Sequence, residues 1–415
     1  MGQNGRDLWQ GLGIGPGDLL IPKQAYLNSF WPVVALDQYT SQPEVWEEAE
    51  RRIGENPSTL RLVVPEAFLD EAEKRSEKAC LAMEDYLKRD LFDRLEDSFV
   101  LLERETQSGK RIGLVVCVDL EDYDYLEGNQ PLIRATEETV QSRIPPRLKV
   151  REQSKMEVSH VMLLADDPED SLIGPLYQKR ETLKKIYDLP LLMDGGQVKG
   201  WQVRDEEDKK ALAGRVKALK NTIQDGAFLF AVGDGNHSLA TAKASWEKQK
   251  QGLSPEEQKD HPARFAMAEL VNLHSGALLF EPIHRIAFDK SRQELLDILS
   301  PLLPQKAESK PDLILLDQEG DLPIKIHCAG DELAVAAVQR LLDQAQLKLD
   351  YVHGEDALRE IRKKQGGTGI LMPDFEKSRL FPTVQRDGKL PRKTFSMGEA
   401  NEKRFYLEAR HIRND

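Results

Sequence analysis

Six residues, Gly233-Asp234-Gly235-Asn236-His237-Ser238, form a polar turn between an apolar run and a stretch of small residues. The apolar run at 227–232 (AFLFAV) predicts a buried strand, and the small residues that follow predict a helix. A helix that begins at such a turn presents free backbone N–H groups and a partial positive charge, which together bind anions. The pattern therefore predicts a phosphate-binding turn formed by Gly233, Gly235, Asn236 and Ser238, whose glycines permit close approach of a ligand.

Two side chains of this turn could do chemistry beyond binding. His237 could donate a hydrogen bond or a proton, and Asp234 could hold a metal ion or orient a hydroxyl group. The same residue types also make ordinary Asx turns and helix N-caps. In that alternative Asp234, Asn236 or Ser238 caps the helix and His237 is a surface residue, and the sequence leaves both alternatives open.

A second set of residues is mainly cationic and stands out because the chain is acidic, with 58 Lys and Arg against 71 Asp and Glu. Phosphoryl transfer needs cations on the transferring group and a carboxylate or Mg²⁺ to manage the nucleophile. Glu137, Glu138 and Asp234 could supply the acidic part, with Glu137 and His237 as the acid and base groups. For any single arginine, a surface ion pair is the alternative. The phosphate- or nucleotide-binding residues predicted outside the turn are Arg143, Arg147, His284, Arg285, Lys393 and Thr394.

A metal-dependent hydrolase would instead use Asp234 together with His237, His274 and His284. The chain has no H-E-x-x-H motif, and His274 and His284 lie ten positions apart. The glycine-rich loop 366–369 lacks the Lys and Ser/Thr of a P-loop, so it predicts a flexible connection.

The motifs of the chain resemble those of domain-of-unknown-function family 1015 of bacteria and archaea, over nearly the whole length. The turn at 234–238 corresponds to that family's Asp-Gly-His-His-Arg, with Asn236 and Ser238 as departures. Residues 136–139 (TEET) correspond to its His-Glu-x-Thr stretch, with Thr136 in place of the histidine. Residues 120–123 (LEDY), 282–285 (PIHR) and 391–394 (PRKT) lie where the family has Leu-Glu-Asp, Pro-Thr-His-Arg and Met-Pro-Lys-Ser-Thr.

The Asp-Gly-x-His turn on a helix start is also similar to the nucleotide-binding turn of the ParB and sulfiredoxin superfamily, which includes free-serine kinases. This local resemblance implies a nucleotide-dependent phosphotransferase that uses ATP or ADP with Mg²⁺ and phosphorylates a small hydroxylated metabolite, free serine first. A nucleotide- or metabolite-binding regulator without catalysis is the alternative that the departures at Thr136, Asn236 and Ser238 favour.

Composition limits the other classes of function. The net charge of −13 argues against a protein that coats nucleic acid. Three distant cysteines, Cys80, Cys117 and Cys328, exclude a disulfide framework, and no window approaches the roughly 20 apolar residues of a membrane helix. We expect a cytoplasmic protein whose partner is a small-molecule substrate, neither nucleic acid nor membrane.

The elements that must position these residues include both helices and strands. The pattern predicts an α/β protein with a central mixed sheet flanked by helices, in regions 1–125, 126–290 and 291–415, the last a smaller α+β module. The turn lies in the central region. Strands are expected at 31–36, 60–64, 99–104, 112–119, 161–164, 227–232, 264–273, 278–286, 313–316, 324–327 and 370–372, and helices at 41–53, 66–92, 205–221, 294–302 and 331–345.

Overall fold

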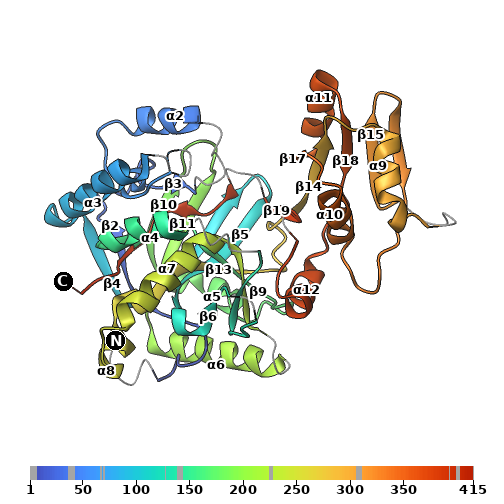
Figure 1. Cartoon of the computed structure of the whole chain (residues 1–415). Helices are drawn as coiled ribbons and strands as arrows, with labels where there is room; N and C mark the ends of the chain where they lie inside the picture. The colour runs from blue at the N-terminus through green and yellow to red at the C-terminus, as the bar shows by residue number, and fades with distance from the viewer. Residues whose placement is uncertain are drawn as a thin grey trace. The chain divides into compact units, whose positions relative to one another are not determined.

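The computed structural model describes residues 7–35, 43–65, 68, 71–126, 128–137, 144–223, 228–304, 311–391, 393–398 and 402–414. The chain divides into two compact units (Figure 1). Unit 1 comprises Met1–Leu278, Val384–Gly388 and Glu399–Asp415, and unit 2 comprises Leu279–Thr383 and Lys389–Gly398. The division into three regions stays a prediction.

Unit 1 is built on a mixed sheet that has 13 strands in the described part of the chain. Its main order is β6-β7-β12-β9-β13-β5-β4-β2-β21-β8; β1 pairs with β5, and the β10–β11 hairpin joins at β4. The pairs β6–β7, β7–β12 and β9–β13 are parallel, and the other pairs are antiparallel. The strands are β1 Ile14–Gly15, β2 Gly17–Pro22, β4 Phe92–Thr106, β5 Gly109–Asp119, β6 Tyr123–Asp124, β7 Ile133–Ala135, β8 Met156–Val158, β9 Met162–Ala165, β10 Lys184–Pro190, β11 Gln197–Val203, β12 Phe230–Asp234, β13 Phe265–Asn272 and β21 Ala409–His411, and a separate pair is β3 Val33–Val34 with β20 Phe405–Tyr406.

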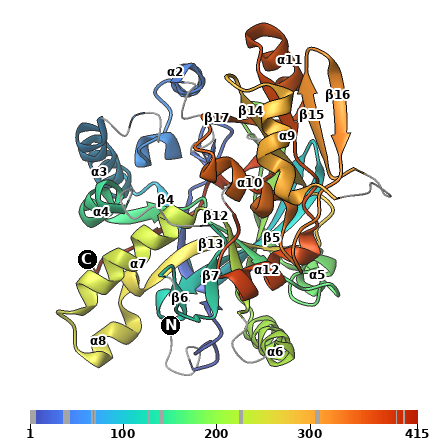
Figure 2. The same ribbon diagram turned by 45° about the vertical axis from the view of Figure 1, so that its right-hand side comes forward.

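Both faces of this sheet are covered, which explains why its central strands are apolar at almost every position. In β5, Leu114 and Val116 face one core cluster, and Val115 and Cys117 face the other. Helices α5, α6 and α7 complete the first cluster, and α2 and α3 complete the second (Figures 1 and 2). The helices of unit 1 are α2 Pro43–Ile53, η2 Thr59–Leu62, α3 Ala72–Lys88, η4 Leu120–Asp122, α4 Ile144–Gln153, α5 Gly174–Gln178, η6 Arg180–Thr182, α6 Glu206–Thr222, α7 Asn236–Lys250, α8 Pro255–Asp260 and η7 Pro262–Arg264.

Unit 2 is a smaller α/β body with its own sheet, in the order β16-β15-β18-β14-β17, and β19 extends the pairing of β14. Helix α11 packs on β14, β17 and β18, and α9 packs beside α10 and on β15. Helix α12 (Leu380–Asp387) divides between the two units. The other elements are β14 Phe280–Ala287, α9 Arg292–Leu299, η8 Ser300–Leu302, β15 Leu313–Asp317, β16 Gly320–Ile324, α10 Ala334–Gln344, β17 Leu349–His353, α11 Glu355–Gln365, β18 Thr368–Leu371, η9 Lys377–Arg379 and β19 Phe395–Met397.

The predicted α/β class with a central mixed sheet is confirmed, as are the helix up to Ile53 and the β4–β5 hairpin. Two strand predictions are wrong. Residues 60–64 begin in the 3₁₀ helix η2, because the hydroxyls of Ser58 and Thr59 bond locally and to the carbonyl of Trp31 and so satisfy the backbone without a sheet. The strand expected at 324–327 ends at Ile324, since a tight turn pairs Asp317 with Gly320 and fixes an earlier register.

None of the described helices combines the length and the apolar character needed to cross a membrane.

Candidate functional site

The turn after β12 has the geometry that the sequence predicts. Strand β12 ends at Asp234, Gly235 takes the left-handed conformation (φ +79°, ψ +26°), and α7 begins at Asn236. No side chain caps this helix; Asp234 Oδ1 instead accepts a hydrogen bond from the amide of Gly235 at 2.9 Å. The first intrahelical bond runs from the amide of Leu239 to the carbonyl of Gly235 at 3.0 Å. The N–H groups of the first turn of α7 therefore have no capping side chain, so the capping alternative does not describe this turn.

Glycine is required at position 235 for two reasons, which gives the first prediction. A side chain there is strained by the positive φ, and a Cβ would lie 3.0 Å from Val161 Cα. We expect Gly235→Ala to lower the free energy of unfolding by about 1–3 kcal/mol, measured by urea denaturation. Gly214→Ala is the matched control, because Gly214 lies in α6 with nothing within 4 Å of a Cβ and should gain about 0.5–1 kcal/mol. Equal effects of the two substitutions would contradict this account.

The acidic stretch predicted to join the turn follows the neighbouring strand. Strand β7 runs parallel to β12 with Ala135 opposite Val232, and the buried Thr136 hydroxyl donates to the carbonyl of Val232 at 2.6 Å. Thr136 therefore fixes the end of β7 beside the turn. Glu137, the next residue, is exposed. Glu138 and Arg143 lie outside the described residues.

Lys403 approaches the turn from a segment that the sequence did not connect with it. Its Nζ lies 3.5 Å from Asp234 Oδ2, and both side chains are largely buried. Among the described residues, neither Asp234 Oδ2 nor Asn236 Oδ1 has a hydrogen-bond partner, although both atoms are buried. Unsatisfied buried oxygens carry a free-energy penalty and are typical of places where a ligand completes the bonding.

A cavity of about 190 Å³ in unit 1 reaches the first turn of α7. Ser238 and Arg147, both predicted phosphate-binding residues, line it, whereas His237 is not among the lining residues. Helices α4 and α7 pack together and carry these two residues. The structure thus brings Arg147 and Ser238 to one cavity although 91 positions separate them.

Two further residues of this cavity, His160 and Tyr406, were missed by the sequence analysis. Their side chains form a hydrogen bond of 2.9 Å between the Tyr406 hydroxyl and His160 Nδ1. The other ring nitrogen, Nε2, lies 3.4 Å from the point where a Cβ on Gly235 would be. A histidine oriented by a hydroxyl and placed beside an anion-binding turn is suited to proton transfer.

A buried ionic network holds the segments that carry His160, Lys403 and Tyr406. Arg404 donates to the carbonyl of Ser159 at 2.8 Å and pairs with Glu269 at 3.1 Å and Glu408 at 3.0 Å. Burial alone would raise the pKa of Glu269, but Arg111 and Arg404 hold it below its ordinary value. The network therefore fixes the two segments of the site to strand β13.

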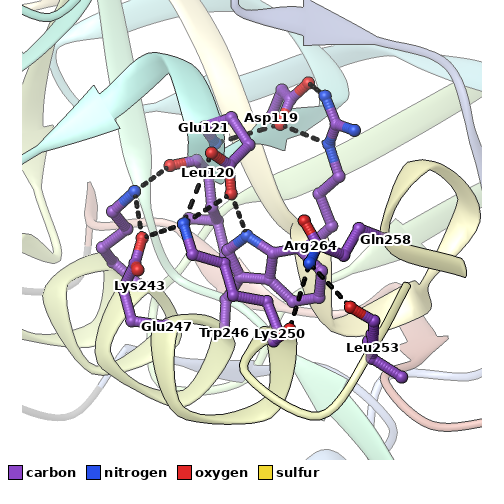
Figure 3. Close-up of polar contacts among 10 residues, drawn as sticks. All are labelled: Asp119, Leu120, Glu121, Lys243, Trp246, Glu247, Lys250, Leu253, Gln258 and Arg264. Atoms are coloured by element: carbon purple, nitrogen blue, oxygen red, sulfur yellow. Dashed lines mark hydrogen bonds and ion pairs between the residues drawn. The ribbon is translucent and has the colours of Figure 1, made fainter. Parts of the chain in front are cut away.

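The Leu-Glu-Asp motif anchors α7 from its other half (Figure 3). The carboxylate of Glu121 accepts hydrogen bonds from the indole of Trp246 and from Lys250, and Lys243 donates to the carbonyl of Leu120 at 2.8 Å. Arg264 forms a two-pronged pair with Asp119, at 2.9 and 2.6 Å. This motif positions the helix whose N-terminus forms the turn.

The remaining predicted residues belong to unit 2. The Arg285 guanidinium is fully buried and donates to Gln339 at 3.2 Å and to the carbonyls of Ile283 and Lys393. Burial lowers its pKa to about 10. His284 Nδ1 accepts from the amide of Met372 at 3.1 Å, and burial lowers the pKa of this histidine.

Thr394 donates to the carbonyl of Pro391 at 2.5 Å, and Lys393 is exposed with φ +58°. Arg392 lies outside the described residues. Roles in phosphate binding for His284, Arg285, Lys393 and Thr394 stay predictions.

For a metal ion, we find no group of three or more His, Cys, Asp or Glu side chains with suitable geometry in the described ranges. Of the histidines in the hydrolase alternative, His274 pairs with Asp166 at 2.6 Å.

No curated protein matches this chain. Similar solved structures include free serine kinase in complex with AMP, with 12% identity, a TM-score of 0.37 and coverage of 72% of this chain and 91% of that one. A mutant of that kinase in complex with ADP has 12% identity, a TM-score of 0.39 and coverage of 75% and 95%. SbnI with C-terminal truncation from Staphylococcus aureus has 9% identity, a TM-score of 0.36 and coverage of 68% and 82%. TM-scores and identities this low do not support a function for this chain, so the proposal below rests on the residues of the site. The family model described as "Protein of unknown function (DUF1015)" matches residues 20–360, and the chain therefore belongs to that family.

Proposed function

We propose that this protein is a nucleotide-dependent phosphotransferase that acts on a small hydroxylated metabolite, with free serine as the first candidate. One observation carries the proposal: the uncapped N-terminus of α7 opens beside a cavity that Arg147, Ser238 and His160 line. An anion site, a cation and a proton acceptor are the groups that phosphoryl transfer requires.

The transferred phosphate binds at the first turn of α7. Backbone N–H groups at a helix N-terminus and the helix dipole favour a negative charge there. Ser238 adds a hydroxyl donor, and Arg147 neutralises the charge that develops on the phosphate oxygens. Gly235 brings the backbone close to the phosphate because no side chain stands in the way.

The nucleotide is ATP or ADP with Mg²⁺. The residues present fit the ion, because Asn236 Oδ1 and Asp234 Oδ2 are buried hard oxygen ligands of the kind that Mg²⁺ takes; among the described residues neither atom has a hydrogen-bond partner, and Asp234 Oδ2 has the ammonium of Lys403 at 3.5 Å. Mg²⁺ when bound neutralises charge on the phosphate oxygens. Lys403, which lies against Asp234, holds that carboxylate in place beside the turn.

His160 accepts the proton of the attacking hydroxyl. For Nε2 to do so, Nδ1 must carry the hydrogen and donate it to Tyr406, the partner at 2.9 Å. The hydroxyl oxygen then bonds to the terminal phosphorus, the bond from that phosphorus to the nucleotide breaks, and the nucleotide leaves with the electron pair. We assign this role to His160 because it lines the cavity. The roles of His237 and Glu137 as acid and base stay predictions, and substitution of each residue in turn distinguishes them from His160.

Nucleotide binding is the direct test, and it gives the second prediction. ADP or ATP with Mg²⁺ at about 100 times its Kd should stabilise the protein by about 2.7 kcal/mol and raise the thermal unfolding midpoint. Arg147→Met should reduce this shift. The control Lys149→Met, an exposed residue of the same helix, should leave it unchanged.

The transfer reaction is followed as ADP or AMP release with serine, threonine and small polyols as acceptors. Turnover with serine supports the proposal in full. Nucleotide binding without turnover on any acceptor would indicate a regulator, and no shift with any nucleotide at millimolar concentration would contradict the proposal.

A further inference from the structure

The same cavity is lined by a second arginine of α4, Arg151, and one nitrogen of its guanidinium has no hydrogen-bond acceptor among the described residues. Arg151 of α4 pairs through Nη1 with Glu157 Oε2 at 2.6 Å. Its Nη2 is buried and has no hydrogen-bond partner among the described residues. A buried cationic donor without an acceptor carries a free-energy penalty. The hydrogen bonding of Arg151 is therefore complete only when a bound ligand supplies an oxygen to Nη2.

Glu157 does not supply that oxygen. Its Oε1 accepts from Arg410 at 3.1 Å and from the amide of Met267 at 2.9 Å, and its Oε2 pairs with Nη1 of Arg151 and not with Nη2. Burial alone would raise the pKa of Glu157, but Arg151 and Arg410 keep it below its ordinary value, so the carboxylate is charged.

Three other polar side chains of the cavity are already engaged in local hydrogen bonds. The hydroxyls of Ser154 and Thr241 donate to backbone carbonyls at 3.0 and 2.7 Å, and Ser159 Oγ accepts from the amide of Val161 at 3.1 Å. Most of the remaining lining is apolar. Among the described residues that line this cavity, Arg151 Nη2 is the buried side-chain nitrogen that is left without an acceptor.

We propose that this cavity is the acceptor pocket and that Arg151 selects acceptors that carry a carboxylate, binding one carboxylate oxygen through Nη2. This inference rests on the proposed function. A cavity of about 190 Å³ lies below the range of about 300–1,000 Å³ typical of larger ligands, which suits an acceptor the size of a small hydroxy acid. The acceptor hydroxyl then lies toward His160 and Ser238, and the carboxylate lies toward Arg151.

The test compares glycerate with glycerol by titration calorimetry, because the two differ by a carboxylate in place of a hydroxymethyl group. Glycerate should bind the wild-type protein at least tenfold more tightly than glycerol. Arg151→Lys keeps a charge for Glu157 but loses the fork, and it should weaken glycerate binding about tenfold or more without changing that of glycerol. Lys149→Met is the control on the same helix and should change neither.

Three outcomes would overturn the acceptor pocket: equal binding of glycerate and glycerol, unchanged glycerate binding in Arg151→Lys, or inorganic phosphate binding at Arg151 more tightly than glycerate. The wild-type comparison needs no variant, so a folding defect in Arg151→Lys does not remove the test. ADP binding is measured on the same samples. If the wild-type protein does not bind ADP, the result counts against the proposed function. If it binds ADP but does not bind glycerate, the result counts against this inference alone.

Discussion

His160→Ala should lower the turnover number for phosphate transfer by about 10²-fold or more, because a positioned acid–base group typically contributes about 10²–10⁴-fold. His237→Ala should have a much smaller effect, since His237 does not line the cavity. The measurement is kcat for transfer from ATP or ADP to the acceptor that the screen identifies. Circular dichroism of both variants shows whether the fold is retained.

Tyr406→Phe is the finer control on His160. It removes the hydroxyl partner of Nδ1 and keeps the ring, so it should lower kcat less than His160→Ala and shift the pH profile of kcat. If His237→Ala and Glu137→Gln abolish turnover while His160→Ala keeps it, the assignment of the base to His160 is wrong and the roles of His237 and Glu137 are supported.

Arg404→Met should lower the free energy of unfolding of unit 1 by about 3–5 kcal/mol, because it removes the ion pair of the buried Glu408 carboxylate and leaves the buried Glu269 carboxylate with Arg111 alone. The readout is urea denaturation followed by tryptophan fluorescence, and all five tryptophans lie in unit 1. The control Arg52→Met removes an exposed pair with Glu48 on α2 and should cost about 0.5 kcal/mol or less.

The pH dependence of this difference is a second readout. In the wild type the lowered pKa of Glu269 contributes stability above the unfolded value of 4.5, and this contribution is lost as the pH falls. Arg404→Met removes one of the two cations that lower this pKa. The stability difference between the two proteins should therefore be larger at pH 7 than at pH 4. A difference that is constant or grows at low pH would contradict the ionic account of the network.

The parts of this structure that follow from local sequence could be predicted. The turn at 233–238 is encoded by consecutive residues, because an apolar strand, a glycine at a positive φ and a helix of small residues each depend on near neighbours. The same is true of α2 and the β4–β5 hairpin. The error at 60–64 arose because an apolar run does not reveal that Ser58 and Thr59 will bond to a carbonyl 27 or 28 positions away.

The parts of the site that depend on sheet pairing could not be predicted. His160 precedes β9, and Lys403 and Tyr406 lie in a segment that joins the sheet only because β21 pairs with β2 and β8. No spacing rule connects positions more than 240 residues apart. The surroundings of Arg285 could not be predicted either: its guanidinium bonds to Gln339 and to the carbonyl of Lys393, 54 and 108 positions away, and its role in phosphate binding stays a prediction.

The segment 402–414 belongs to unit 1, although all of unit 2 precedes it in the chain. On the ribosome, the strands of residues 1–278 emerge first and must wait for β20 and β21 while unit 2 is made. Until then β2 and β8 lack the strand that joins them, and Glu269 is without Arg404. The nascent chain thus carries open sheet edges and an incompletely paired carboxylate for the whole time in which unit 2 is translated, and unpaired strand edges of this kind are prone to aggregate.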